Sequence, residues 1–113
     1  MFSMRLLLLA CAGPSESSPP DSAPPAECAS APDVTWQNWG HGFFLTYCGA
    51  CHSATSPNRD GAPENVNFDT KAEVVGMKDR IRARVLEEQT MPLGGGVYEE
   101  DLELLNVMLA CGL

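Results

Sequence analysis

The sequence predicts a small helical domain in residues 34–113, and three stretches carry this prediction. In residues 35–47 aromatic side chains recur at steps of three and four, which is the pattern of an amphipathic helix. Residues 68–89 are mostly compatible with helix, and residues 99–110 carry a leucine stripe at helical spacing. No βαβ pattern is visible in the chain.

The length and charge of the chain limit its class. It has 113 residues, which is enough for one domain at most. Its formal net charge is −8, and it has no basic tract of the kind that binds nucleic acid. We expect no nucleic-acid partner, and we expect a monomer. A folding unit of this size buries a limited core and usually needs a staple.

Residues 1–10 have the layout of a lipoprotein signal peptide. One positive charge, Arg5, precedes an apolar run, and the sequence Leu8-Leu9-Ala10-Cys11 resembles a bacterial lipobox. That resemblance implies cleavage before Cys11 and acylation of this cysteine. The apolar run is shorter than usual, and an ordinary cleaved signal or a chance run of leucines is the alternative. No window approaches the roughly 18 apolar residues of a membrane-spanning helix.

Residues 11–33 are the predicted lipidated cysteine and tether. Residues 12–33 contain six Pro, five Ser and five Ala, with almost no large apolar side chain. Such a segment cannot bury enough surface to offset the entropy lost on ordering, so it predicts a semi-extended linker. A linker of this kind suits a lipid anchor, and the two features support each other.

The first predicted helix covers residues 35–47 and begins after a cap at Asp33 or Thr35. Gly40 lowers the helix propensity but permits another helix to approach closely. His41 lies seven residues before Cys48, which is about 10 Å along the helix. This distance disfavours a role for both residues at one metal site, so we interpret His41 as a partly solvated histidine. The aromatic stripe, which we interpret as core, consists of Trp36, Trp39, Phe43, Phe44 and Tyr47.

This helix leads directly into Cys48-Gly49-Ala50-Cys51-His52, the signature of c-type haem attachment. Two thiols three positions apart lie on one side of a helix or tight turn, so both reach one porphyrin edge and form thioethers with its vinyl groups. His52 is then held beside the iron as the proximal ligand. The alternatives are a redox-active dithiol, which expects a βαβ context, and half of a zinc site, which expects a second ligand pair. We predict one covalently bound haem c.

Residues 53–67 are polar and contain Pro and Gly, so they predict a loop beside the haem edge. We expect Arg59 in this loop to be a surface residue, and a contact with a haem propionate is the alternative. The sequence Thr70-Lys71-Ala72-Glu73 fits a capping box, and a further helix is expected at about residues 78–88. We interpret the basic cluster on that helix as mostly a solvated face. A further hypothesis is that one of its arginines pairs with a haem propionate. The cluster consists of Lys78, Arg80, Arg82 and Arg84.

Met91 is the predicted sixth ligand of the iron. Pro92 disfavours a helical conformation at Met91, and the glycines at 94–96 do not sustain a helix, so Met91 is presented from an irregular loop. Met108 lies in an apolar helix face and Met77 at a helix junction, so both fit a ligand role less well. Iron with His and Met ligands has a raised potential suited to electron transfer.

The last predicted helix covers residues 99–110. Acidic residues load its first turns, where the helix dipole favours anions, and Gly112 stands at the usual stop. The remaining cysteines, Cys28 and Cys111, stand at the two ends of the folded part. In an oxidising compartment such a pair tends to form a disulfide, and two free thiols are the alternative.

Together these features resemble a small monohaem class I cytochrome c, of the type found in tethered bacterial periplasmic lipoproteins. The haem motif at 48–52, Met91-Pro92 about forty residues later and the helices carry the resemblance, which covers residues 34–113. It implies an all-α, cytochrome c-like fold of about four helices around one haem. The first and last helices would cross near a haem edge and bring Cys28 near Cys111. The tryptophan often found near the last helix of such domains is absent, which leaves its packing role to leucines.

The resemblance implies a periplasmic one-electron carrier with no catalytic residue, not an enzyme. Expected partners are membrane-bound or periplasmic redox proteins with a positive docking patch. The lipid at Cys11 would hold the protein on the periplasmic side of a bacterial membrane, and outer-membrane sorting is compatible with the sequence. The alternative function is a haem-based gas-sensing or ligand-binding module in which Met91 is displaceable. A haem peroxidase is disfavoured, because no distal His or Arg is placed to cleave a peroxide bond.

Overall fold

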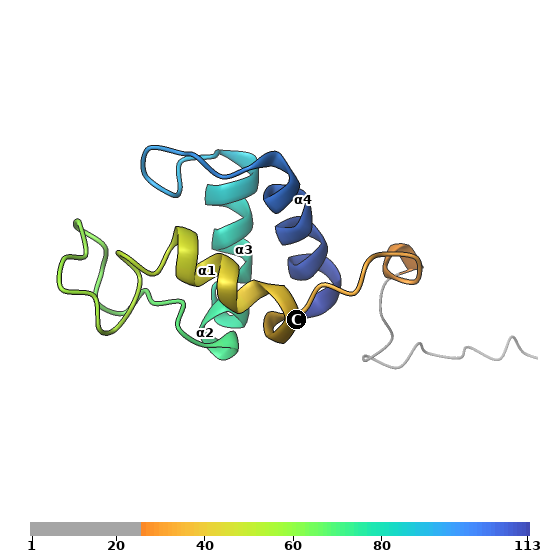
Figure 1. Ribbon diagram of the computed structural model, residues 1–113, viewed down its shortest axis with the longest axis horizontal. Helices are drawn as coiled ribbons and strands as arrows, with labels where there is room; N and C mark the ends of the chain where they lie inside the picture. Colours follow the sequence, from red (N-terminus) through yellow and green to blue (C-terminus); the bar gives the residue numbers. More distant parts are fainter. Residues whose placement is uncertain (1–25) are drawn as a thin grey trace, which may run out of the picture.

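The computed structural model describes residues 26–113, and every regular element in this range is a helix (Figure 1). The predicted all-α class is therefore confirmed for these residues. The signal peptide, Cys11 and most of the tether lie outside them. No helix among the described residues is long and apolar enough to cross a membrane.

Four α-helices and their extensions make up the fold. A 3-10 turn, η1 (Ala26–Cys28), comes first, and the α-helices are α1 (His41–Tyr47), α2 (Lys71–Gly76), α3 (Lys78–Ile81) and α4 (Glu99–Val107). Three of the α-helices are extended by π-helical turns, which are η2 (Trp36–Gly40) before α1, η3 (Arg82–Glu87) after α3 and η4 (Met108–Gly112) after α4. The three predicted helical stretches are confirmed, with boundaries within a few residues of those expected.

Two capping boxes start the first two helical stretches. Thr35 Oγ1 accepts a hydrogen bond from Asn38 N at 3.2 Å, and Asn38 Oδ1 accepts one from Thr35 N at 2.8 Å. Of the two caps left open by the sequence, the chain uses Thr35. The predicted box before α2 is confirmed, because the Thr70 and Glu73 side chains cap each other's backbone N–H. Each box satisfies amide groups that a helix N-terminus leaves without partners.

The core lies where the stretches η2–α1, α2–η3 and α4–η4 meet. Phe44, Val74, Leu105 and Met108 are its fully buried members, and no polar or charged residue is buried in the described part of the chain. The aromatic stripe contributes Phe43 and Phe44, and the leucine stripe contributes Leu105 and Leu109. The complete core consists of Val34, Phe43, Phe44, Val74, Ile81, Val85, Leu105, Met108 and Leu109.

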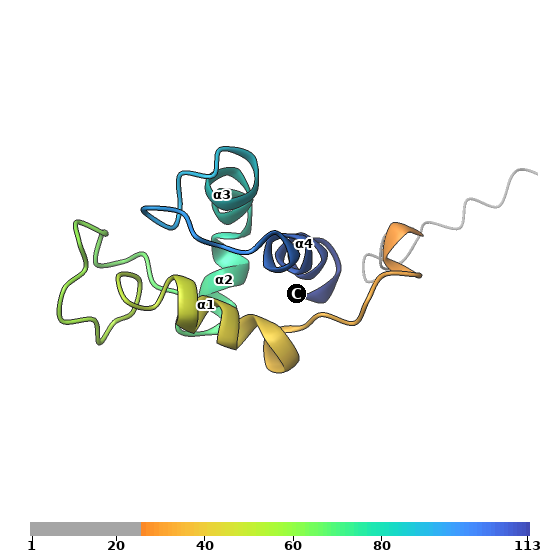
Figure 2. The ribbon, with the colours of Figure 1, turned by 45° about the horizontal axis from the view of Figure 1, so that its top comes forward.

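The first and last helical stretches meet at Gly40, and Figure 2 shows α4 nearly end-on next to the stretch η2–α1. A Cβ at Gly40 would collide with Met108 Sδ and would lie 3.1 Å from Met108 Cε. The close approach expected for Gly40 is therefore present. Tyr47 makes a second link, since its hydroxyl donates to Asp101 Oδ2 at 2.8 Å. This hydrogen bond to a carboxylate raises the pKa of Tyr47 above its ordinary value.

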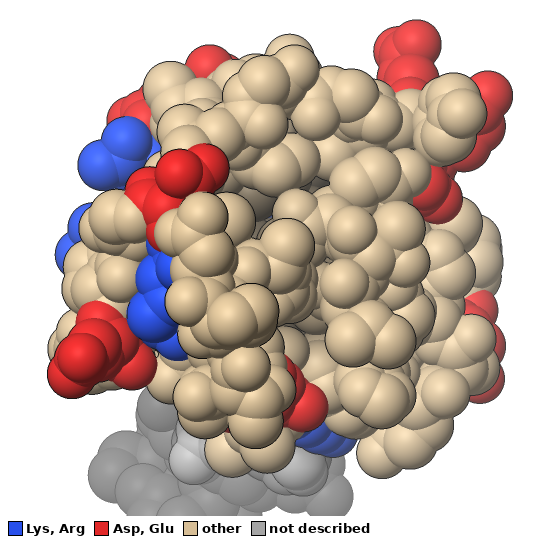
Figure 3. Space-filling view, turned by 60° about the vertical axis from the view of Figure 1, so that its left-hand side comes forward, with Lys and Arg blue, Asp and Glu red and all other residues tan. Residues whose placement is uncertain are grey.

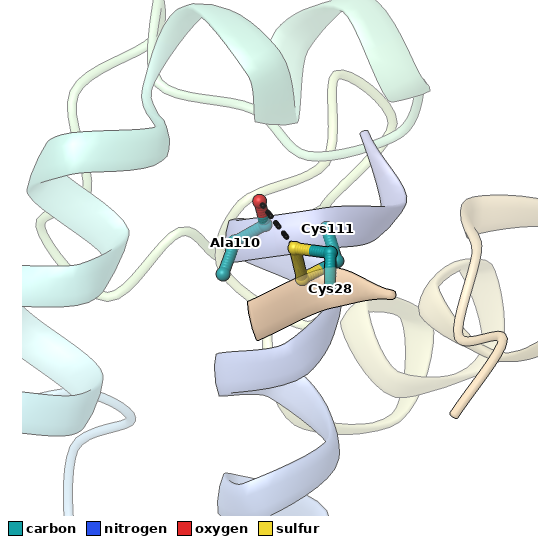
Figure 4. The surroundings of a disulfide bond; sticks show 3 residues. All are labelled: Cys28, Ala110 and Cys111. Carbon is teal, nitrogen blue, oxygen red and sulfur yellow. Dashed lines mark hydrogen bonds between the residues drawn. A yellow bond between two sulfur atoms is a disulfide. The ribbon is translucent and has the colours of Figure 1, made fainter. Parts of the chain in front are cut away.

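A disulfide joins Cys28 to Cys111, with Cα atoms 5.6 Å apart (Figure 4). Cys28 comes from the segment before η2, and Cys111 comes from η4. Cys28 Sγ lies 3.7 Å from the Ala110 carbonyl oxygen. The pairing expected for these two cysteines is present, and it fastens the N-terminal segment to the last helix.

Replacing Gly40 with Ala should destabilise the protein. The added Cβ forces Met108 out of its buried position, and overpacking of this kind costs about 1–3 kcal/mol. Gly42→Ala is the matched control, because a Cβ at Gly42 meets nothing within 4 Å and Ala is the better helix former. Unfolding by denaturant measures both variants. Equal stabilities of the two variants would contradict the close helix contact.

Removing the disulfide should also destabilise the fold. The bridge spans a sequence separation of 83 residues, and in the chain-entropy model a loop of this length contributes about 4 kcal/mol. We expect the double variant Cys28→Ser/Cys111→Ser to lose stability on this scale in denaturant unfolding. Thiol counting on the denatured, unreduced protein provides an independent check, and the finding of free thiols at both positions would refute the bridge.

Candidate haem-attachment site

The haem motif forms a hydrogen-bonded turn that continues α1. Cys48 N donates to Phe44 O at 2.9 Å, and His52 N donates to Cys48 O at 2.8 Å. A third bond runs from Cys51 N to Cys48 O at 3.2 Å. Residues three apart in such a turn lie on one side, so the two sulfurs are placed to reach one edge of a macrocycle. Both thiols are free and half-buried.

The environment of Cys48 is unlike that of a redox-active dithiol. Burial, followed by the charge of Cys51, raises the pKa of the Cys48 thiol to about 12. A reactive dithiol needs a lowered thiol pKa, because the thiolate is the nucleophile. The alternative of a redox Cys-x-x-Cys is therefore disfavoured.

The zinc alternative needs at least three protein ligands close together. Residues 26–113 contain no group of three or more His, Cys, Asp or Glu placed to hold a metal ion. His41, the other histidine of the chain, is exposed, and its ring lies tilted against Trp36 with centroids 5.2 Å apart. The interpretation of His41 as a solvated residue is confirmed.

The His52 ring is held in one tautomer. Its Nδ1 lies 2.9 Å from the Val66 carbonyl oxygen. A carbonyl only accepts hydrogen bonds, so Nδ1 carries a proton, and in the neutral imidazole the lone pair is then on Nε2. The ring also packs against Phe68, with centroids 5.1 Å apart. Neutral imidazole with a hydrogen-bonded Nδ1–H is the usual state of a histidine that binds a metal through Nε2.

Arg59 holds the loop that supplies this carbonyl. Its guanidinium donates to four backbone carbonyls, at Ser53 (2.6 Å), Ala62 (3.3 Å), Pro63 (2.6 Å) and Val66 (3.0 Å). Arg59 is less exposed than a free surface side chain, because it lies half-buried under the loop, and the four bonds were not expected from the sequence. A loop without regular structure must find donors for its carbonyls, and this need was the signal available in the sequence.

Asp69 fastens the far end of the same loop. One of its carboxylate oxygens accepts a hydrogen bond from Ala54 N at 2.9 Å. The backbone bond from Ala54 and a bond from the Ser53 side chain lower the pKa of Asp69 below its ordinary value. Together with Phe68 N, which donates to His52 O at 2.8 Å, this contact closes the loop back onto the haem motif.

Met91 lies in an irregular segment at the end of η3, as predicted. Thr90 N and Met91 N both donate to Arg84 O, at 2.8 and 3.2 Å. Met91 is half-buried against the same core as Cys48, whereas Met108 is fully buried. Figures 1 and 2 both show the loop after η3 on the same side of the bundle as the loop after α1.

The face on this side is shown in Figure 3. Its centre is hollowed and carries no Lys, Arg, Asp or Glu, while charged side chains lie around the rim. Two thiols, an imidazole and a thioether are the donor set that a covalently attached haem with iron at its centre would use. The residues present therefore fit a covalently bound haem.

The basic cluster has protein partners for two of its members. Arg82 donates to Asn106 Oδ1 at 2.7 Å, and Arg84 lies 3.7 Å from a Glu88 carboxylate oxygen. Lys78 and Arg80 are exposed. The pairing of one of these arginines with a haem propionate stays a prediction.

Comparison of the chain with models of known protein families, with curated proteins and with solved structures found no match. The case for the site is therefore made by the chain's own residues.

The Asp69 contact predicts a pH dependence of loop stability. The folded-state pKa is lowered, so the unfolded chain binds a proton more readily than the folded one. The contribution of Asp69 is fully present above the unfolded value of about 3.9 and is lost as the pH falls through the folded pKa. We expect Asp69→Asn to remove this acid-dependent part of the stability, measured by unfolding between neutral and acidic pH. An identical pH profile in the variant would contradict the contact.

Proposed function

We propose that residues 34–113 form a haem c domain of the class I cytochrome type that carries single electrons. In this proposal Cys48 and Cys51 hold the porphyrin through thioethers, and His52 and Met91 are the axial ligands. The observation that supports it most is the state of His52. Its Nδ1 is engaged by the Val66 carbonyl, and two free thiols, Cys48 and Cys51, lie in the same turn.

The chain's own residues explain what each part contributes. The turn at 48–52 places the backbone of His52, the Val66 carbonyl orients its imidazole, and the Arg84 carbonyl fixes the backbone at Met91. When bound, a haem with His and Met ligands supplies a reversible one-electron couple with a raised potential. Redox proteins deliver and remove the electron, and we propose no catalytic acid, base or nucleophile.

The proposed location follows from the N-terminal segment. Acylation at Cys11 would anchor the chain to the periplasmic side of a bacterial membrane, and residues 12–33 would act as the tether. A tether raises the local concentration of the domain near membrane-bound partners. The net charge of −8 favours partners with a positive docking patch, because electrostatic attraction speeds the encounter of the two proteins.

A gas-sensing or ligand-binding module is the second candidate. It requires Met91 to leave the iron, and the loop that follows Met91 offers some freedom, since Gly94, Gly95 and Gly96 all have positive φ and are exposed. Carbon monoxide distinguishes the two functions. A ferrous protein that keeps both axial ligands resists carbon monoxide, whereas a sensor binds it.

Expression with the haem-attachment machinery, followed by absorbance spectra of both redox states, tests the proposal. We expect covalently bound haem, a six-coordinate spectrum in both states and a reversible couple in a potentiometric titration. A purified protein without covalent haem, or one with haem but no reversible couple, would reject the electron-carrier function.

Met91→Leu should remove the sixth ligand and keep the side-chain volume. We expect the variant to lose the Met–iron charge-transfer band and to have a lower reduction potential, because the thioether favours the ferrous state. Met77→Leu is the matched control, since Met77 lies half-buried at the junction of α2 and α3. A Met91→Leu protein with an unchanged spectrum would show that another residue is the ligand.

A further inference from the structure

The Val66 carbonyl accepts two hydrogen bonds, one from His52 Nδ1 at 2.9 Å and one from Arg59 Nη2 at 3.0 Å. We infer that Arg59 is a positioning residue for His52. It fixes this carbonyl and, by sharing it, controls the strength of the His52 hydrogen bond and so the reduction potential of the bound iron. The inference rests on the proposed function, because it takes His52 as the axial ligand.

The four bonds of Arg59 explain why the carbonyl stays in place. A guanidinium has five N–H donors in a rigid planar fork, and here the fork joins both ends of the loop. Arg59 forms no ion pair within 4.0 Å among the described residues, although its charge contributes to the lowered pKa of Asp69. All four hydrogen bonds of its guanidinium go to neutral carbonyl oxygens, and one of these is the acceptor for His52.

Sharing the carbonyl weakens its bond to His52. A cationic donor makes the stronger hydrogen bond and withdraws electron density from the oxygen, which then accepts less from Nδ1–H. A histidine whose Nδ1–H is held less strongly is a less basic ligand. A less basic ligand stabilises the ferric state less.

The positive charge of Arg59 acts in the same direction. Reduction adds one electron, delivered by a redox protein, and no bond at His52 forms or breaks, so the Nδ1 proton stays in place. The ferrous state carries one positive charge fewer than the ferric state, so a nearby cation favours it. Both effects raise the reduction potential, and removal of Arg59 should lower it.

The test compares four full-length haem-loaded proteins, namely the natural protein, Arg59→Gln, Arg59→Lys and Arg80→Gln. Arg59→Gln should decrease the ferrous-to-ferric ratio at the natural midpoint about tenfold, which corresponds to about 59 mV. Arg59→Lys keeps the positive charge but not the planar guanidinium, so its reduction potential should lie between those of the natural protein and Arg59→Gln. Arg80→Gln removes the same charge from an exposed position, where solvent screens it, and should change the ratio less than about twofold.

Proton NMR of the ferrous protein gives a second readout, the His52 Nδ1–H signal. In Arg59→Gln its bond to Val66 should strengthen, with a downfield shift.

An Arg59→Gln protein that is less stable but has an unchanged potential and an unchanged Nδ1–H signal would leave Arg59 a purely structural role and overturn the inference. If that variant does not fold, Arg59→Lys decides, since a potential equal to the natural one overturns the inference as well. Failure of the proposed function is visible earlier, in the natural protein itself, as the lack of covalent haem or of a reversible couple.

Discussion

The loop between His52 and Phe68 has to satisfy its own backbone, because it contains no helix or strand whose hydrogen bonds would do so. One half-buried guanidinium, that of Arg59, meets this need by donating to carbonyls at both ends of the loop. The position of the Val66 carbonyl depends on this arrangement, and the orientation of the His52 ring depends on Val66. The candidate iron ligand is thus held by a chain of contacts that starts at Arg59.

The helices form a core that is small and entirely apolar in the described residues. Two features compensate for its size. The first and last helices come into contact at Gly40, where the absence of a side chain leaves room for Met108. The disulfide between Cys28 and Cys111 then ties the N-terminal segment to the last helix. A covalently bound apolar macrocycle would add buried surface beside this core, which a domain of this size needs.

The methionines show how packing selects among chemically equal candidates. Each carries the same thioether, but Met108 is enclosed between the first and last helices and is needed there. Met91 follows a helix end, where Arg84 O holds two successive amides and leaves the side chain at the border of the core. Burial by the rest of the chain, and not residue type, separates a core residue from a candidate ligand.

Contiguous residues were enough to predict the helical stretches, the box at Thr70 and Glu73 and the attachment turn, because each depends on neighbours within four positions. The Cys28–Cys111 pairing was also accessible, since few other cysteines remained. The bonds of Arg59 and the bond from Tyr47 to Asp101 were missed, because both depend on partners that only the folded chain brings together. The sequence alone determined which residues are candidates to hold a haem, through local spacing. The tertiary structure decided how His52 is oriented, since its partner Val66 is placed by a loop whose shape no local pattern encodes.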